Sequence, residues 1–260
     1  MLRAIPRTLD DSKLESFLLS DKAAFLYFLG DLEPPFSERT RFATIEWDEQ
    51  ILGVALVYQE SSAAALLAYA PNESLGIILD TLKPPQEFAF HITPNLLDEM
   101  ERQALVSSAE SFKRYVRQGT PEAFNHPNCR KLQLKDLPAA RKLKSGIDEI
   151  WFTTEQFSIN PFVGVFDDDQ MIAMAGTHCF SASRNVAALG SIGVHPSRRG
   201  EGWGECATRA ILSEMRGVVD FIGLNVVEDN RVARRLYEKL GFKECDSWVM
   251  GMAEWDVLKS

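Results

Sequence analysis

Three glycines at alternating positions, Gly200, Gly202 and Gly204, form a short loop between an apolar run and a segment with a helical pattern. Glycine lacks a Cβ, so such a loop takes left-handed conformations and lets its backbone approach phosphate oxygens closely. The helix that follows offers N–H groups without intrahelical partners and the positive end of its dipole. Arg198 and Arg199 add positive charge just before the glycines. These features predict a pyrophosphate cradle in preference to a turn without a ligand.

Two other nucleotide-binding loops fit this sequence poorly. A P-loop needs Gly-Lys-Ser/Thr at the start of its helix, whereas the residues from Gly204 read Gly-Glu-Cys. The stretch Gly202-x-Gly204-x-x-Ala207 satisfies the dinucleotide fingerprint taken alone. However, Asp220, at about the distance of the ribose-binding acid, begins a predicted strand instead of ending one. Only 56 residues follow Gly204, too few to complete a doubly wound sheet.

Two segments of the chain resemble the GNAT acetyltransferase superfamily, in the family's order. Residues 199–204 (RGEGWG) are similar to its R/Q-x-x-G-x-G/A signature, and residues 230–242 (NRVARRLYEKLGF) are similar to its N-x-x-A-x-x-L-Y-x-x-x-G-F segment. The resemblance covers about residues 130–255 and leaves the first half unmatched in motif. It implies the GNAT acyl-CoA N-acyltransferase fold. This is an α/β fold in which helices pack on a sheet of mixed parallel and antiparallel strands (α+β mixed sheet).

The resemblance also implies acetyl-CoA as co-substrate and a reaction in which an amine attacks the thioester carbonyl directly. The backbone of residues 192–194 would contact the pantetheine arm, residues 199–205 would hold the pyrophosphate, and Asn230 would lie near the reactive end. The implied cofactor-binding residues are therefore Ile192, Gly193, Val194, Arg199, Gly200, Glu201, Gly202, Trp203, Gly204, Glu205 and Asn230. No metal ion is expected in this reaction.

The developing oxyanion needs a donor, for which the N–H of Val194 is the candidate, and the departing thiolate needs a proton. By resemblance, Tyr237 is the candidate proton donor, although its position one turn from Ala233 and Leu240 also suits a tyrosine packed under the sheet. The family's general base is missing, because Asn225 stands where some members carry a glutamate.

Other residues remain candidates for the general base, or a water chain could serve. They are Glu149, Glu155, His178 and His195. Residues 148–157 (DEIWFTTEQF) are expected to shape an acceptor pocket, or to place aromatic rings in the core and acids on the surface.

Composition and charge narrow the class of protein. With 45% hydrophobic and 25% charged residues and a net charge of -9, the chain is neither disordered nor a small disulfide scaffold. Residues 1–125 carry 11 Lys/Arg and 19 Asp/Glu, whereas residues 126–260 carry 17 and 18. An acidic first half argues against nucleic acid or an anionic membrane as a partner.

The sequence gives little indication of a targeting segment, a membrane helix or a metal-binding motif. The first residues lack the apolar core of a signal peptide, and no run approaches the roughly 20 apolar residues of a membrane helix, so a cytoplasmic location is expected. The four cysteines are far apart and form no Cys-x-x-Cys, which suggests neither a zinc site nor a disulfide framework. The aspartates at 167–169 fit a solvated turn better than a calcium loop.

Hydrophobic patterning predicts the elements that must position the loop. In the second half these are a helix capped by Asp136 and running to about Lys144, strands at 162–166, 171–180 and 187–194, a helix at 205–216, a strand at 218–227, a helix capped by Asn230, and a last strand at 242–252. The first half has nearly the same order: a helix at 12–29, strands at 42–47, 51–58 and 63–69, a helix at 73–82, a strand at 87–92, a helix at 94–102 and a strand at 112–117.

This order indicates a degenerate structural repeat, with a GNAT-like domain at residues 1–125 and a GNAT N-acetyltransferase domain at 126–260. The turn-rich residues 118–127 mark the boundary. One continuous mixed sheet is the alternative. The first-half loop at 69–76 has neither the glycine series nor an arginine, so this half is expected to have lost phosphate binding and to line the acceptor site or an interface.

The leading hypothesis for function is therefore an N-acetyltransferase that acts on a small-molecule primary amine. The alternatives are a catalytically silent CoA-binding sensor and a protein N-acetyltransferase. A homodimer is a further possibility that the sequence allows, and the sequence does not identify the amine.

Overall fold

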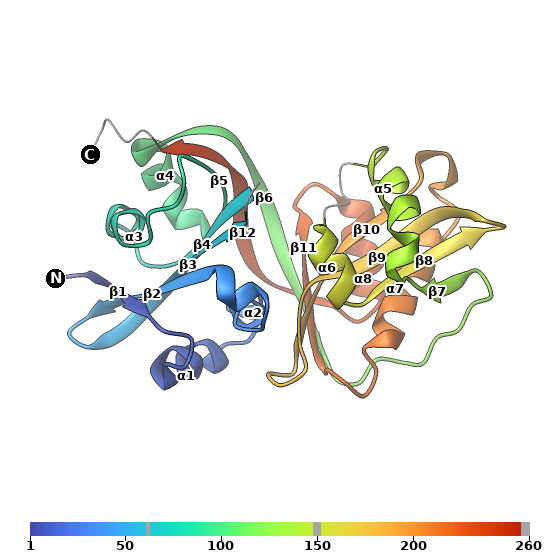
Figure 1. Ribbon diagram of the computed structural model, residues 1–260, viewed down its shortest axis with the longest axis horizontal. Coiled ribbons are helices and arrows are strands. Elements are labelled where there is room, and N and C mark those ends of the chain that lie inside the picture. Colours follow the sequence, from blue (N-terminus) through green and yellow to red (C-terminus); the bar gives the residue numbers. More distant parts are fainter. Residues whose placement is uncertain (61–62, 148–151, 256–260) are drawn as a thin grey trace. The chain divides into compact units, whose positions relative to one another are not determined.

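The computed structural model describes residues 1–60, 63–147 and 152–255 (Figure 1). These residues form two compact units. The first unit comprises Met1–Arg114, Val226–Asn230 and the residues from Cys245 on, and the second comprises Tyr115–Asn225 and Arg231–Glu244. The predicted domain boundary at residue 125 stays a prediction. The two compact units divide the chain differently, because residues 245–255 belong to the first unit.

The described strands pair in one 12-stranded mixed β-sheet, which is the continuous sheet that the sequence left as the alternative. The second unit holds all or part of six neighbouring strands, in the order β6 (Ala104–Gln118), β11 (Phe221–Val227), β10 (Val186–Val194), β9 (Gln170–Ser181), β8 (Phe162–Asp167) and β7 (Cys129–Lys131). Neighbouring strands from β7 to β10 are antiparallel, whereas β10 and β11 run parallel. A parallel pair needs a crossover, and here the connection contains a helix, α7.

The helices of the second unit are α5 (Leu137–Lys144), α6 (Thr154–Ile159), α7 (Trp203–Glu214) and α8 (Arg231–Lys239). Short 3-10 turns lie at Leu134–Asp136 and Pro196–Arg198. A cluster of buried side chains from α5, α6, β8 and β9 forms a core that includes Leu143, Phe157 and Phe162. The predicted cradle is the connection between the C-terminal end of β10 and the N-terminus of α7.

The first unit has a similar order of elements. Its strands are β1 (Arg3–Arg7), β2 (Thr40–Trp47), β3 (Gln50–Glu60), β4 (Ala63–Tyr69), β5 (Glu87–Ile92) and β12 (Lys243–Trp255), and its helices are α1 (Ser12–Ser20), α2 (Leu26–Gly30), α3 (Leu75–Leu82) and α4 (Leu97–Gln103). Here too, 3-10 turns lie at Phe36–Arg39 and Pro94–Leu96. Strand β4 runs antiparallel to β3 and parallel to β5, with α3 in the crossover. This is the arrangement of β9, β10, α7 and β11.

The C-terminal strand β12 pairs within the first unit's part of the sheet. Residues 249–254 of β12 pair antiparallel with residues 87–92 of β5, from Val249↔Ile92 to Glu254↔Glu87. Strands β6 and β12 each begin in one compact unit and end in the other. The last strand predicted for the second half therefore serves mainly the first unit.

Most predicted elements are confirmed, but the single helix expected at residues 12–29 is wrong. The structure has α1 and α2 instead, because α1 ends at Ser20 and the following residue, Asp21, has a non-helical conformation. The carboxylate of Asp21 accepts hydrogen bonds from the N–H groups of Ala23 and Ala24, which starts a new turn. The pattern also missed the short elements β1, β7 and α6. Strand β11 begins at Phe221, not at 218, because Gly217 is left-handed and the chain turns after α7.

Helix α5 begins where the sequence predicts, but Asp136 acts differently from a simple helix cap. Its carboxylate accepts a hydrogen bond from the N–H of Gln133 at 2.8 Å and two from the guanidinium of Arg130, both at 2.8 Å. The side chain of Asp136 is 9% exposed. The hydrogen bonds from Arg130 lower its pKa from 3.8 to about 2.

We therefore expect Asp136→Asn to lower the free energy of unfolding at pH 7 by about 1–2 kcal/mol. Because the pKa of Asp136 is depressed in the folded state, its contribution is present above the unfolded value of 3.8 and disappears as the pH falls toward 2. Urea unfolding at several pH values measures this difference. The exposed Asp169→Asn is the control and should match the wild type. Equal stabilities of wild type and Asp136→Asn at pH 7 would contradict the assignment.

Candidate functional site

Strand β10 carries a β-bulge just before the predicted cradle. Between Gly190 and Gly193 its register with β9 shifts, so that Ser191 and Ile192 lie opposite a single residue. Ser191 has a φ of 52°, in the left-handed region. A bulge interrupts the ladder and increases the local twist, which frees backbone groups from strand pairing.

The end of β10 also has one edge without strand pairing. Within the described residues, the strand pairing between β10 and β11 ends at Leu189↔Leu224, so residues 190–194 of β10 have no paired residue in β11. The N–H of His195 donates to a carbonyl of β9 at 2.8 Å. Because consecutive strand residues direct their peptide groups to alternate sides, Val194 points its own N–H and C=O away from β9. In agreement, the Val194 carbonyl accepts a hydrogen bond from Arg199 Nε at 3.3 Å.

The glycine loop has the conformation that the sequence predicts. Gly200 and Gly202 have φ values of 81° and 88°, and Gly202 is the N-terminal cap residue of α7. A Cβ at either position would meet nothing within 4 Å, so backbone conformation and not space demands glycine there. Gly204 lies within the helix, where a Cβ would lie 3.5 Å from Val194 and 3.8 Å from Leu236.

The two arginines before the glycines have different environments. Arg198 Nη1 lies 2.5 Å from a carboxylate oxygen of Asp167, and its Nε lies 2.9 Å from Glu201. The indole N–H of Trp203 donates to Glu201 as well, and these hydrogen bonds hold the pKa of Glu201 below its usual range. Arg198 thus fastens the loop to the β8–β9 turn. Arg199 is exposed, with its Nε on the Val194 carbonyl.

Helix α8 packs beside the start of α7. Lys239 Nζ lies 2.6 Å from a carboxylate oxygen of Glu205, in the first turn of α7. Leu236 lies against Gly204, as the 3.8 Å approach to its Cβ position shows. Tyr237, the next residue, is 7% exposed and its ring makes an edge contact with Phe242. Burial raises the pKa of Tyr237, so its phenol stays protonated at neutral pH.

Comparison with known families identifies the second half. Residues 122–242 match the model of the Acetyltransferase (GNAT) family. This half of the chain is a GNAT-family domain. Within the part of the chain that the structure describes, no helix is long and apolar enough to cross a membrane.

Solved structures extend the likeness to the whole chain at the level of the fold. A Drosophila protein superposes with a TM-score of 0.69 at 15% identity, covering 95% of this chain and 98% of its own. A tandem GNAT protein from the clavulanic acid biosynthesis pathway gives 0.56 at 14% identity, covering 98% of each chain. A GNAT-family protein from Novosphingobium aromaticivorans gives 0.60 at 20% identity, covering 74% and 84%. The first half therefore has a GNAT-like fold.

The first half has the helix that corresponds to α7, but its N-terminus is already bonded within the protein. In α3, the N–H groups of Leu75 and Gly76 donate to the carboxylate of Glu99 at 3.0 and 3.2 Å. Glu99 is 8% exposed and comes from α4. Strands β3 and β4 pair without a register shift, in contrast to the bulged pair of the GNAT domain. A carboxylate of the chain thus bonds the N–H groups that a bound phosphate would need.

The predicted base candidates lie in different settings. The ring of His178 packs against Gly190, where a Cβ would lie 2.0 Å from it, and burial lowers its pKa to about 4. His195 Nδ1 lies 2.8 Å from Ser197 Oγ in the turn after β10. Glu155 lies in the first turn of α6, and Glu149 lies outside the described residues. None of these contacts identifies a base.

Two predicted roles stay predictions. Asn230 belongs by its contacts to the first compact unit, whereas the glycine loop belongs to the second. Its contact with the cofactor is therefore still an expectation from the motif. The acceptor segment folds in part as α6, where Thr153 and Gln156 form a reciprocal capping box.

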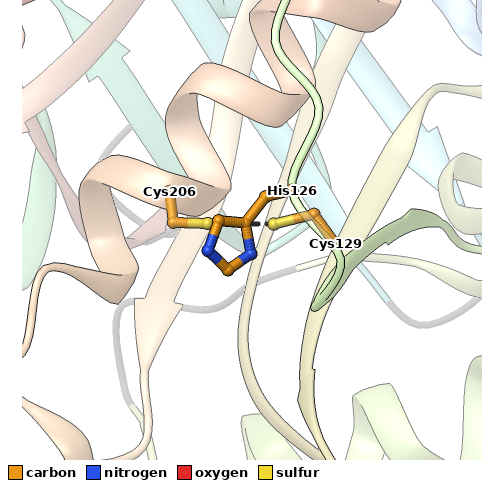
Figure 2. A group of neighbouring side chains, drawn as sticks. All are labelled: His126, Cys129 and Cys206. Atoms are coloured by element: carbon orange, nitrogen blue, oxygen red, sulfur yellow. Dashed lines mark hydrogen bonds between the residues drawn. The ribbon is translucent and has the colours of Figure 1, made fainter.

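The structure also brings together three residues that sequence spacing did not connect. Cys129 in β7 and Cys206 in α7 are 77 positions apart, and their Sγ atoms lie 3.0 Å from one another (Figure 2). The imidazole of His126 lies beside them, with all three ligand atoms within 4.8 Å. The spacing His126-x-x-Cys129 is the local signal that could have drawn notice, but a single such pair is too common to predict a cluster.

The two kinds of glycine in the cradle predict opposite effects on stability. Gly202→Ala should lower the free energy of unfolding by about 1 kcal/mol, because alanine is strained at positive φ. Gly204→Ala should leave stability unchanged or raise it by about 0.5 kcal/mol, because alanine favours a helix and its Cβ makes ordinary contacts. Urea unfolding compares both with the wild type. Equal destabilisation by both substitutions would contradict the described loop conformation.

Proposed function

We propose that the GNAT domain binds acetyl-CoA and transfers its acetyl group to a primary amine, most simply that of a small molecule. The observation that carries this proposal is the backbone at the end of β10. There the N–H of Val194 faces the edge without strand pairing, and Gly200 and Gly202 turn the chain into the N-terminus of α7. Oriented N–H groups of this kind suit a pyrophosphate next to an extended amide-containing arm.

The reaction follows from direct attack. The amine nitrogen forms a bond with the thioester carbonyl carbon, the carbon–sulfur bond breaks, and the products are an acetamide and free CoA. The Val194 N–H would stabilise the oxyanion that develops on the carbonyl oxygen. The phenol of Tyr237, protonated at neutral pH and one residue from the contact of Leu236 with the cradle, would give its proton to the departing thiolate.

Charge distribution favours a cationic or neutral acceptor over an anionic one. The chain carries 37 acidic against 28 basic residues, and most of the excess lies in the first half. The proton that the amine loses has no assigned acceptor among the described candidates, so a water-mediated path or the segment at residues 148–157 would have to supply one.

One observation favours a second function, CoA binding without transfer. Asn225 replaces the glutamate base of some family members, and His178 is a weak base because burial lowers its pKa to about 4. A domain of this kind would sense acyl-CoA and not consume it. The two functions bind the same ligand and differ only in turnover.

The experiment that separates them measures free thiol released from acetyl-CoA in the presence of a panel of amines, including polyamines, aminoglycosides and peptide N-termini. Thermal stabilisation is recorded in parallel. Amine-dependent thiol release supports the transferase, and stabilisation by acetyl-CoA without release supports the sensor. If no CoA ester stabilises the protein or is consumed, both functions are wrong.

Arg199 should contribute to cofactor affinity. Arg199→Gln removes an exposed cation next to the Val194 carbonyl, and we expect the Kd for acetyl-CoA to rise about tenfold, equivalent to about 1.4 kcal/mol. Arg216→Gln removes the same charge just beyond the opposite end of α7 and is the matched control. Calorimetric titration measures both, and an unchanged Kd for Arg199→Gln would remove its assigned contact.

Tyr237→Phe should lower kcat about 10²-fold while the Kd for acetyl-CoA stays within twofold, since a general acid acts in the reaction and not in binding. The control is Tyr115→Phe, which removes the hydroxyl of another buried tyrosine, bonded to Glu238 and Arg234. That control should keep its kcat. Full activity of Tyr237→Phe would reassign Tyr237 to packing under the sheet.

A further inference from the structure

Three side chains of the second unit form a cluster that the proposed acetyl transfer does not use. His126 precedes β7, Cys129 begins β7, and Cys206 lies in the first turns of α7 (Figure 2). One thiol is buried, and the imidazole and the other thiol are partly exposed. The cluster is thus partly exposed, at His126 and Cys129.

Neighbouring rings hold the imidazole in place. The His126 ring stacks on Phe124, with the ring planes 10° apart, and makes an edge contact with Trp203 at 84°. The N–H of Asn128 reaches His126 Nδ1 only at 3.2 Å. An imidazole that is oriented by packing and weakly hydrogen-bonded loses little when it exchanges that contact for a metal ion.

We propose that His126, Cys129 and Cys206 form a binding site for one Zn²⁺ ion, with three protein ligands and one position open to solvent. Two thiolates and one imidazole are ligands that zinc prefers, and they would neutralise its two positive charges. Binding replaces the protons of the two thiols by the metal and releases both to solvent. This inference does not depend on the proposed acetyl transfer.

The geometry needs only a small adjustment to accept the ion. Tetrahedral zinc with Zn–S bonds of about 2.3 Å holds its two sulfurs roughly 3.8 Å apart. The two Sγ atoms lie 3.0 Å apart, so the side chains must separate by less than 1 Å. A disulfide would have to draw them together and would leave the imidazole without a role, which is why the histidine favours metal.

The position of the site connects it to the cradle. Cys206 lies four residues after Gly202, the cap residue of α7, and Trp203 contacts His126. A bound ion would therefore tie the first turns of α7 to β7 and its preceding segment. The expected result is a more stable start of α7 in the metal-bound protein.

The test begins with the full-length protein, reduced, freed of metal with a chelator and titrated with Zn²⁺ against a chromophoric chelator. We expect one tight site per chain and a rise in melting temperature. Co²⁺ is a second probe, because its tetrahedral thiolate complexes show visible d–d bands and sulfur-to-metal charge transfer. Mass spectrometry after alkylation provides a readout without mutation. Zn²⁺ should protect Cys129 and Cys206 but not the exposed Cys245.

Variants localise the ion. Cys129→Ser and Cys206→Ser should each lower the affinity for Zn²⁺ at least about 100-fold and abolish the cobalt charge-transfer band, and His126→Ala should weaken binding while thiolate bands remain. Cys245→Ser also removes a thiol and should keep the full stoichiometry. Circular dichroism of each metal-free variant confirms that it is folded.

Three outcomes would overturn the proposal. The first is a wild type that binds no more Zn²⁺ than the Cys129→Ser/Cys206→Ser double variant. The second is equal protection of Cys245 by the metal. The third is a non-reduced protein that lacks the mass of two hydrogen atoms, carries a Cys129–Cys206 disulfide and takes up no zinc after reduction.

Discussion

The backbone between residues 191 and 204 imposes the constraint on which the proposed function depends. Ser191, Gly200 and Gly202 all have positive φ, and between the first and the last of them the chain leaves a bulged strand and enters α7. This path turns Val194 toward an edge without strand pairing and leaves the first N–H groups of the helix without intrahelical partners. Arg198 holds the path in place through Asp167 and Glu201, and Arg199 is exposed beside the loop with its Nε bonded to the Val194 carbonyl.

The two halves place different groups at the start of the corresponding helix. Both have a helix in the crossover between parallel strands. In the GNAT domain the helix begins at a left-handed glycine, and its first turn carries Glu205, which is paired with Lys239 of α8. In the first half, Glu99 bonds two N–H groups at the start of α3. A carboxylate so placed satisfies the same kind of donors that would bind a phosphate, so we expect no phosphate to bind at the start of α3.

Local sequence patterns predicted the features that depend on neighbouring residues in the chain, namely most strands and helices and the glycine loop. All strands but the short β1 and β7, and most helices, follow from hydrophobic periodicity, and the glycine loop follows from glycine's conformational freedom. Periodicity missed the break at Asp21, because a side-chain hydrogen bond and not the apolar pattern ends α1. It also missed the bulge at Ser191 and the pairing of Arg198 with Asp167, since both depend on neighbouring strands. The cluster of His126, Cys129 and Cys206 needed the fold itself, because β7 and α7 meet only in three dimensions.

Amide hydrogen exchange with and without acetyl-CoA reports on the backbone groups at the end of β10 and the start of α7, to which cofactor binding is assigned. We expect slower exchange at residues 192–194 and 199–206 on addition of acetyl-CoA, with the amides of Leu75 and Gly76 in the first half unchanged. Protection confined to other parts of the chain, or no protection at saturating acetyl-CoA, would contradict it.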